Sequence, residues 1–363
     1  MIAMTTNHKI FIIAEAGVNH NGSIDLARKL VDAAVDAGAD AVKFQSFIAA
    51  SIVTATASKA EYQIANTGSS ESQLEMLKKL ELSHPQQREL FAYCKNQGIQ
   101  FLSTPFDFES LKFLTADLGL ETIKIGSGEL TNAPFLLEVA RCTDKIILST
   151  GMSTTEEIEI SLGVIAFGMT TDNTSKPSIA ACKKALSSDA GRHNLRQRVT
   201  LLQCTTDYPT SPADINLRAI VTLREKFNCA VGLSDHSVGT HIAVGAVAMG
   251  ATIIEKHLTI SRNLVGPDHQ ASLEPNEFKR LVANIRDIEI AFGSAEKTLT
   301  ANELKNQQVA RRSIVASKPI KLGEIFTIDN IEVKRPGTGM SPFKYWDLLG
   351  TKSTRDIAKN ELV

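Results

Sequence analysis

Short apolar runs alternate with helical patterns along most of this chain. The first run covers residues 9–14, and apolar residues at helical spacing follow it over 27–35. Gly38 ends that helical pattern, as glycine commonly does at the C-terminus of a helix. Further runs of the same kind, each followed by a helical pattern, lie at 41–44, 99–102, 122–125, 145–148, 199–202, 230–233 and 251–254. The pattern therefore predicts eight strands that alternate with helices.

Eight strand–helix units in about 250–300 residues predict a closed (β/α)8 barrel, the TIM barrel. A doubly wound open sheet is the alternative. The first strand-to-helix turn, residues 15–22, lacks the G-x-G-x-x-G spacing of a dinucleotide site, which weakens that alternative. Polar residues also follow nearly every predicted strand. In a barrel these strand ends meet at one mouth, where enzymes of this fold place their chemistry.

Three segments depart from the alternation. Residues 47–84 form a polar excursion after the second strand, and a loop of this length usually carries function or is disordered. Residues 171–198 are interpreted as a surface excursion. Near the C-terminus, Gly and Pro separate short runs, as in a compact β-rich domain. We therefore expect a barrel over 1–295, a linker over 296–308 and a small domain over 309–363.

The composition, 43% hydrophobic and 22% charged residues, is that of a soluble globular protein. Its 39 basic and 40 acidic residues give a net charge of −1, which argues against binding to nucleic acid. No apolar run approaches the roughly 18 residues of a membrane span, and residues 1–9 lack the apolar core of a signal peptide. Five widely spaced cysteines without a C-x-x-C pair are typical of a cytoplasmic protein.

Two histidines, His236 and His257, directly follow neighbouring strands in the predicted barrel. Neutral imidazoles bind divalent metals. A catalytic zinc site normally has three protein ligands, so two histidines favour Mg²⁺ or Mn²⁺ with positions open for water and an oxygen-rich substrate. The alternative is a structural role, in which both side chains form hydrogen bonds at the bases of loops.

Three lysines, Lys43, Lys124 and Lys256, lie in or at the ends of predicted strands. A lysine that points into a barrel can form a Schiff base with a carbonyl substrate or bind a phosphate or carboxylate. Ser127 and Ser149 lie near glycines, whose backbone amides can approach an anion closely. Together these residues indicate a site for a phosphorylated or carboxylated small molecule. The candidate acids and bases are Glu15, Glu129 and Glu255.

A series of motifs extends these observations over nearly the whole chain, at residues 14–22, 42–45, 103–106, 124–129, 148–152, 232–236, 255–257, 266–269 and 335–339. With these motifs in this order, the chain resembles the sialic acid (nonulosonate) synthase family from about residue 10 to 363. The resemblance implies a TIM barrel followed by a small antifreeze-like (SAF) domain. It also implies a domain-swapped homodimer in which each small domain covers the partner's barrel.

Members of that family join phosphoenolpyruvate to an N-acetylated amino-sugar aldehyde, with water, and release phosphate. The acceptor is N-acetylmannosamine or a 2,4-diacetamido-2,4,6-trideoxyhexose, and the product is a nonulosonic acid of the N-acetylneuraminic, legionaminic or pseudaminic type. By resemblance, a divalent metal, Mn²⁺ or Mg²⁺, held by His236 and His257 would polarise the aldehyde. The sequence does not indicate which acceptor or which metal this chain uses.

The resemblance also implies roles for further residues. The expected catalytic residues are Glu15, Lys43, Lys124 and Glu129. The expected substrate-binding residues are Gln45, Thr104, Ser127, Ser149, Tyr208, Asp268 and Arg335. Among them, Lys43, Lys124, Ser127 and Ser149 would hold phosphoenolpyruvate, and Arg335 would reach the sugar's N-acetyl group across the dimer. The chain departs from the family at Gln203, where some members carry histidine.

Three other functions remain open at this stage. An aldolase could use one of the barrel lysines to form a Schiff base with a keto acid, and borohydride would then trap a covalent adduct. A non-catalytic sugar-binding protein would bind its sugar without releasing phosphate. A synthase acting on a sugar phosphate would need a further basic cluster, which the sequence does not place.

Overall fold

The computed structural model describes residues 9–68 and 71–363. The chain divides into two compact units, Met1–Phe292 and Gly293–Val363. Each unit has its own hydrophobic core, one inside the barrel-shaped first unit and one inside the small second unit.

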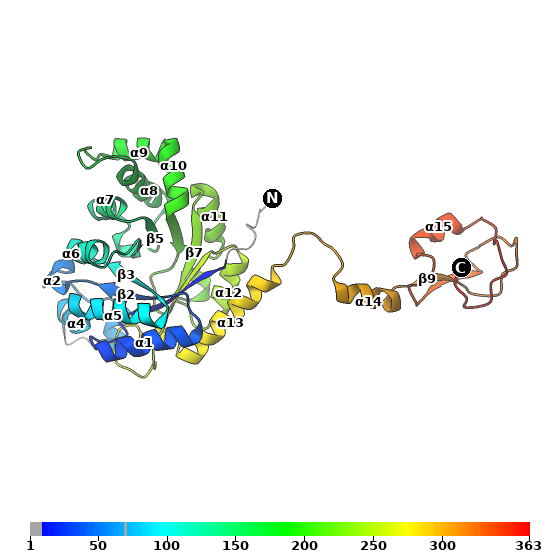
Figure 1. The fold of residues 1–363 in the computed structure, drawn as a ribbon, viewed down its shortest axis with the longest axis horizontal. Coiled ribbons are helices and arrows are strands. Elements are labelled where there is room, and N and C mark those ends of the chain that lie inside the picture. The colour runs from blue at the N-terminus through cyan, green and yellow to red at the C-terminus, as the bar shows by residue number, and fades with distance from the viewer. Residues whose placement is uncertain (1–8, 69–70) are drawn as a thin grey trace. The chain divides into compact units, whose positions relative to one another are not determined.

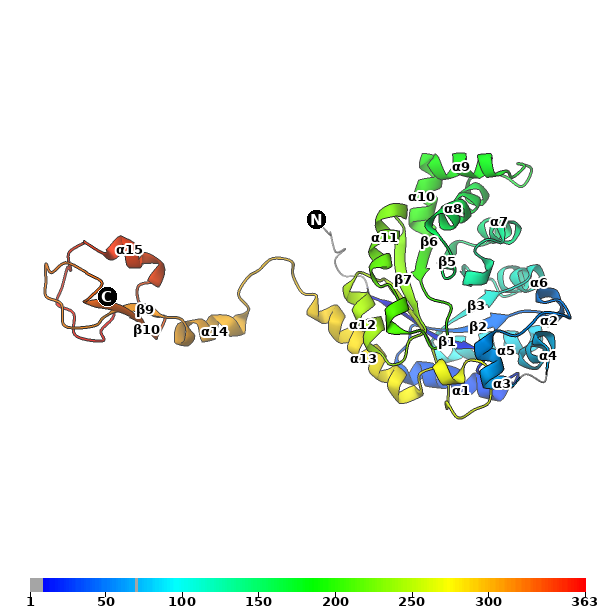
Figure 2. The ribbon, with the colours of Figure 1, turned by 180° about the vertical axis from the view of Figure 1, so that it is seen from behind.

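The first unit is built on an eight-stranded parallel sheet in the order β3-β2-β1-β8-β7-β6-β5-β4. Strands β3 and β4 at the two ends of this order pack side by side, which nearly closes the barrel. The strands are β1 Phe11–Gly17, β2 Ala41–Ser46, β3 Gln100–Pro105, β4 Thr122–Ile125, β5 Lys145–Ser149, β6 Val199–Gln203, β7 Ala230–Asp235 and β8 Ile253–His257. All eight predicted strands are confirmed. Figures 1 and 2 show the helices arranged around them.

The surrounding helices follow the predicted alternation. They are α1 Ile24–Ala37, α5 His84–Gln97, α6 Phe108–Lys112, α7 Ala133–Cys142, α8 Thr155–Thr170, α11 Arg218–Phe227, α12 His241–Ala248 and α13 Pro275–Ala291. Helix α1 shows how local sequence sets the start, the end and the buried face of a helix. The Ser23 hydroxyl accepts the Leu26 backbone N–H at its start, and Gly38 ends it in the left-handed conformation at φ 79°. Its apolar residues face the core, including Leu30 and Val31.

Short 3-10 segments and one π-helical segment complete the irregular structure. The 3-10 segments are Ser127–Glu129, Pro212–Asp214, His269–Ala271 and Pro342–Lys344, and the π-helical segment is Phe113–Asp117.

The excursion after β2 is folded rather than structureless where the structure describes it. It contains α2 Ala49–Ile52, α3 Glu61–Thr67 and α4 Gln73–Leu80. Helix α4 begins at a reciprocal capping box between Ser72 and Glu75. Its buried residues pack with Val18 and Phe47 near the barrel mouth. The packing explains why this polar segment orders.

The second excursion, residues 171–198, is largely helical. It contains α9 Ile179–Ser187 and α10 Asp189–Arg198, which pack against α8. Most of its side chains are exposed, but Cys182, Ala185 and Leu195 are buried. The interpretation as a surface excursion therefore holds for its outer face, while its inner face extends the core.

The barrel interior changes from apolar to polar along the strands. A layer of buried apolar side chains, Ile13, Ala41, Leu102, Ile147, Leu202 and Ile253, fills its centre. Side chains alternate between the two faces of a strand, so residues two positions onward point the same way. Five of those six positions hold Glu15, Lys43, Thr104, Ser149 and Glu255, the sixth holds Cys204, and all six are buried. The polar layer therefore lies directly above the packed apolar layer, towards the C-terminal ends of the strands.

The second unit is a small domain, as predicted, and its two short strands form an antiparallel sheet. Helix α14 Ala301–Ala310 precedes an antiparallel pair, β9 Ser313–Ala316 and β10 Ile331–Lys334, and α15 Tyr345–Leu348 follows. Its core contains Ile314, Ile320, Phe326, Ile331 and Ile357. Helix α14 overlaps the predicted linker 296–308, so that segment is partly helical. Within the described ranges, we find no helix with the length and apolar character to cross a membrane.

Candidate active site

A cavity of about 360 Å³ opens at the C-terminal ends of the barrel strands. It is lined by every first-unit residue that the family resemblance assigns to the site: Glu15, Lys43, Gln45, Thr104, Lys124, Ser127, Glu129, Ser149, Tyr208, His236, His257 and Asp268. These residues come from all parts of the strand order, and the nearly closed barrel brings them together. Arg335 lies in the second unit.

Two lysines and two glutamates form a buried charge network at the floor of the cavity. The Lys43 Nζ lies 2.5 Å from Glu15 Oε2 and 3.6 Å from Glu255 Oε2. The Lys124 Nζ lies 3.4 Å from Glu255 Oε1, which also accepts the Ser234 hydroxyl at 2.8 Å. Opposite charges thus alternate through the network, which offsets part of the cost of burying them.

The two glutamates of this network have opposite pKa shifts. Burial raises the pKa of Glu15 to about 7, more than the attraction of Lys43 lowers it. Burial also acts on Glu255, but Lys124 and Lys43 together lower the pKa of that carboxyl to about 2. Burial lowers the pKa of Lys124 as well. Glu15 is therefore the carboxylate of this network that can exchange a proton near neutral pH.

Hydroxyl groups extend the lysine side of the cavity. The Lys43 Nζ donates to Thr104 Oγ1 at 3.1 Å, and the Lys124 Nζ donates to Ser149 Oγ at 2.8 Å. The Ser127 hydroxyl accepts the Gly151 backbone N–H at 3.0 Å. Two ammonium groups with adjacent hydroxyls can bind an anion with several oxygens, such as a phosphate or carboxylate.

The two histidines lie together in the same cavity, with ring centroids 5.5 Å apart. The His236 Nδ1 lies 2.7 Å from the Thr205 carbonyl oxygen, which requires a proton on that nitrogen and leaves Nε2 as an acceptor. The His257 Nδ1 is buried without a hydrogen-bond partner among the described residues. It lies 3.9 Å from Asp268 Oδ2. Burial lowers the pKa of His236 to about 4, and that of His257 is also well below its ordinary value.

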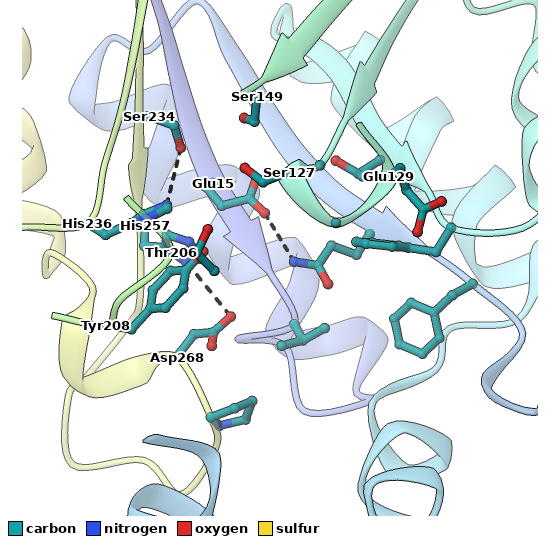
Figure 3. Close-up of a pocket in the computed structure, with 18 of the residues that line it drawn as sticks. Glu15, Ser127, Glu129, Ser149, Thr206, Tyr208, Ser234, His236, His257 and Asp268 are labelled. Carbon is teal, nitrogen blue, oxygen red and sulfur yellow. Dashed lines mark hydrogen bonds and ion pairs between the residues drawn. The ribbon is translucent and has the colours of Figure 1, made fainter. Parts of the chain in front are cut away.

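The histidine pair is therefore neutral, as metal ligands require. The His236 Nε2 lies 3.2 Å from the Ser234 hydroxyl, so a cation there would replace this contact (Figure 3). Over the described ranges, no group of three or more His, Cys, Asp or Glu residues is arranged to hold a metal ion. The residues fit a divalent cation with two protein ligands whose other positions are filled by water and substrate oxygens.

An aromatic and acidic wall adjoins the histidines. The Tyr208 ring lies 4.1 Å from the His236 ring and 5.7 Å from the His257 ring. Burial raises the pKa of Asp268 to about 6. Figure 3 shows Tyr208, Asp268 and the histidines on one side of Glu15, with Ser127 and Glu129 on the other. The cavity thus has an anion-binding side and a separate polar and aromatic side, with Glu15 between them.

The comparison with known proteins decides the family. A model described as "NeuB family" matches residues 30–297, and one described as "SAF domain" matches residues 311–363. The chain belongs to the NeuB family. The N,N′-diacetyllegionaminic acid synthase of Campylobacter jejuni is 46% identical over 98% of this chain and 99% of its own length. The enzyme of the same name from Legionella pneumophila is 41% identical over 96% and 91%.

Solved structures agree with this assignment. The N-acetylneuraminic acid (sialic acid) synthetase of Leptospira borgpetersenii, crystallised with citrate, is 32% identical to this NeuB-family chain. It matches with a TM-score of 0.65 over 82% of this chain and 90% of its own. The family and the barrel-plus-SAF architecture predicted from the motifs are therefore confirmed.

The structure decides the direction of the third candidate lysine in this NeuB-family chain. Lys256 does not line the cavity. Its Nζ pairs with Asp235 Oδ2 at 2.8 Å, fully buried and away from the cavity. Glu255 and His257 line the cavity instead, because side chains alternate along β8.

Gln203 also lies outside the cavity lining. Its side-chain amide donates to the Ile215 carbonyl at 3.0 Å. That bond stabilises the segment after β6, and it gives Gln203 a structural role in this chain.

Sequence reasoning missed the contribution of α3. Tyr62 and Gln63 from this helix line the cavity. The Tyr62 ring lies 5.0 Å from the Tyr208 ring. The only sequence signal was the unusual length of the excursion, which indicated function without indicating residues.

Proposed function

We propose that this chain is a nonulosonic acid synthase that condenses phosphoenolpyruvate with an N-acetylated amino-sugar aldehyde and water, and releases phosphate. The observation that carries the proposal is that one cavity is lined by two lysines with hydroxyl partners, by Glu15 and by two neutral histidines. Membership of the NeuB family and the names of the relatives support it.

Phosphoenolpyruvate fits the lysine side of the cavity. Its phosphate and carboxylate are offset by Lys43 and Lys124, and Ser127, Ser149 and Thr104 supply hydroxyl donors. Lys124 and Lys43 already have carboxylate partners, so they are held in place before the substrate arrives. Such preorganised charges stabilise the transition state without reorganisation.

His236 and His257 would hold the divalent cation, Mn²⁺ or Mg²⁺. When bound, the cation would act as a Lewis acid on the aldehyde oxygen of the acceptor. The hydrogen bond from His236 Nδ1 to the Thr205 carbonyl fixes the ring and leaves the lone pair on Nε2, whose neighbour in the cavity is the Ser234 hydroxyl at 3.2 Å. Tyr208, Asp268, Glu129 and Gln45 would surround the acceptor.

The reaction then follows from these positions. The methylene carbon of phosphoenolpyruvate forms a bond to the aldehyde carbon, whose oxygen gains the electron pair. The adjacent cationic carbon accepts water, and the resulting tetrahedral carbon expels phosphate to leave the 2-keto acid. Glu15 stabilises the cationic carbon and accepts one proton from the water, which then passes to the former aldehyde oxygen to form the hydroxyl group. The second proton of the water leaves with the phosphate. Holding both substrates in one cavity supplies much of the rate.

The relatives favour a 2,4-diacetamido-2,4,6-trideoxyhexose over N-acetylmannosamine, because the legionaminic acid synthases are 46% and 41% identical over nearly the whole chain. The product would then be of the legionaminic type. We also propose the domain-swapped homodimer of the family, in which Arg335 of one chain reaches the acceptor in the partner's barrel.

Phosphate release from phosphoenolpyruvate tests the function directly. We expect release in the presence of Mn²⁺ and the diacetamido sugar, weaker release with N-acetylmannosamine, and none after EDTA. His236→Ala should abolish the response to added metal, since only one protein ligand would remain. Absence of release with both sugars would contradict the proposal. A borohydride-trapped adduct with pyruvate would instead support the Schiff-base aldolase.

A further inference from the structure

Helix α3 lines the cavity with Tyr62 and Gln63, and the proposed reaction has no use for either. The Tyr62 ring lies beside Tyr208, one ring further from the histidine pair than Tyr208 itself. We infer that Tyr62 is the residue that selects the acceptor, by packing against the part of the sugar remote from its aldehyde. This inference rests on the proposed function and deepens it.

Tyr62 lies where the part of the acceptor remote from its aldehyde must extend. If the aldehyde lies at His236 and His257, the carbons that react are beside Tyr208. The rest of the acceptor must extend away from the histidines, and the tilted Tyr62–Tyr208 pair continues the wall in that direction. Aromatic faces suit the C–H surfaces of a sugar and the methyl of an acetamido group, because they bury apolar area without demanding a hydrogen bond.

The side chains of the excursion that line the cavity with Tyr62 are largely apolar. The excursion also lines the cavity with Ile52, Val53, Met76 and Leu77. In the described part of the chain, Lys43 and Lys124 are the only cationic side chains that line the cavity, and both are paired with carboxylates. An uncharged, deoxygenated sugar terminus fits these side chains, whereas a phosphorylated terminus would lack a counter-charge.

A buried lysine fixes α3 in this position. The Lys59 Nζ donates to Thr67 Oγ1 at 3.0 Å and to the Gly68 carbonyl at 2.9 Å, and it lies 3.4 Å from Glu71 Oε1. Its side chain is 2% exposed. These contacts use all three donors of the ammonium group. Lys59 therefore ties the start of α3 to its end, and it is a positioning residue for Tyr62.

A second tie joins α3 to the loop after β8. The Asn66 side-chain amide donates to the Pro267 carbonyl at 2.6 Å. Asp268, the next residue, lines the cavity close to His257. The wall that carries Tyr62 is thus attached to the histidine side of the site.

The experiment measures kcat and KM for Tyr62→Ala and Tyr62→Phe with the diacetamido sugar and with N-acetylmannosamine. For Tyr62→Ala we expect the KM of the diacetamido sugar to rise about tenfold, with a smaller change for N-acetylmannosamine, as loss of an aromatic contact predicts. The KM of phosphoenolpyruvate should stay unchanged. Tyr62→Phe keeps the ring and should stay close to wild type.

Lys59→Met tests whether Lys59 positions Tyr62 by holding the two ends of α3 together. Lys79→Met is its matched control. The exposed Lys79 pairs with the same carboxylate, Glu71, and exposed pairs contribute little to stability. We expect Lys59→Met to raise the KM of the diacetamido sugar but not that of phosphoenolpyruvate, and Lys79→Met to behave as wild type. Thermal melting checks that each variant is folded.

The outcomes separate the inference from the function. If wild type releases no phosphate with either sugar, the proposed function fails and the inference fails with it. If wild type is active but the ratio of kcat/KM between the two sugars is unchanged in Tyr62→Ala, only the inference is overturned. A loss in Tyr62→Phe equal to that in Tyr62→Ala would also overturn it, because packing of the ring would not be the cause.

Discussion

Glu15 and Glu255 lie at the same depth of the barrel, yet their carboxyl groups differ in proton affinity. Glu255 contacts both lysines and its pKa falls to about 2. Glu15 pairs with Lys43 alone, and burial raises its pKa to about 7. The number of cationic partners therefore decides which carboxylate remains ionised and which can handle a proton.

The pH dependence of turnover tests this assignment. Because Glu15 stays protonated until about pH 7, its basic form is depleted at lower pH. We expect wild-type kcat/KM to rise with pH and to level off above about pH 7. Glu15→Gln should lower kcat by about 10²–10⁴-fold and remove this rise, with little change in the KM of phosphoenolpyruvate. Near-normal turnover in the variant would contradict the proposed role of Glu15 in proton transfer.

At the scale of elements, the loop after β5 depends on a glycine. A Cβ built on Gly151 would lie 2.5 Å from Thr206 Oγ1 and 2.8 Å from Ser127 Oγ. Gly151→Ala should therefore displace Ser127 and raise the KM of phosphoenolpyruvate about tenfold or more, with a loss of about 1–3 kcal/mol of stability. Gly245→Ala in α12, where the nearest atom is 3.5 Å away, is the control. Equal kinetics in both variants would contradict the close packing of this loop.

The strands and their terminal side chains could be predicted because two strong patterns coincide. Apolar runs identify the buried strands, and polar residues such as Glu15 and Lys124 directly follow or interrupt them. The direction of Lys256, which points away from the cavity, could not be predicted, because the exact phase of β8 decides which of three successive polar side chains enters the barrel. The roles of individual site residues came from the family resemblance and remain predictions.

Helix α3 could not be predicted for a different reason. Its sequence is polar, it buries no complete side chain, and long-range contacts such as Asn66 with Pro267 hold it. Tertiary contacts of this kind leave no periodic signal in the sequence. Helix α14 was missed for a similar reason, since none of its residues is buried.

At the scale of the whole molecule, Arg335 belongs to a unit with its own core. If the small domain serves the partner's barrel, two inactive variants should complement each other. We expect mixed Arg335→Ala and Glu15→Gln chains, after dissociation and reassembly, to recover about a quarter of wild-type activity. Half of the random dimers are mixed, and each mixed dimer contains one intact composite site. Activity that stays at the level of the separate variants would show that the domain serves its own barrel.

The strands and the excursion differ in what a change of chain length would do to them. Deleting one residue within β8 would turn Glu255 and His257 out of the barrel together and turn Lys256 in, so an inherited deletion there removes the site in a single event. The described part of the segment between β2 and α5 contains helices and no strand, so gains or losses of residues there leave the strand register unchanged and alter the wall around α3. New acceptors could therefore evolve through insertions in this segment while the condensation chemistry is inherited intact.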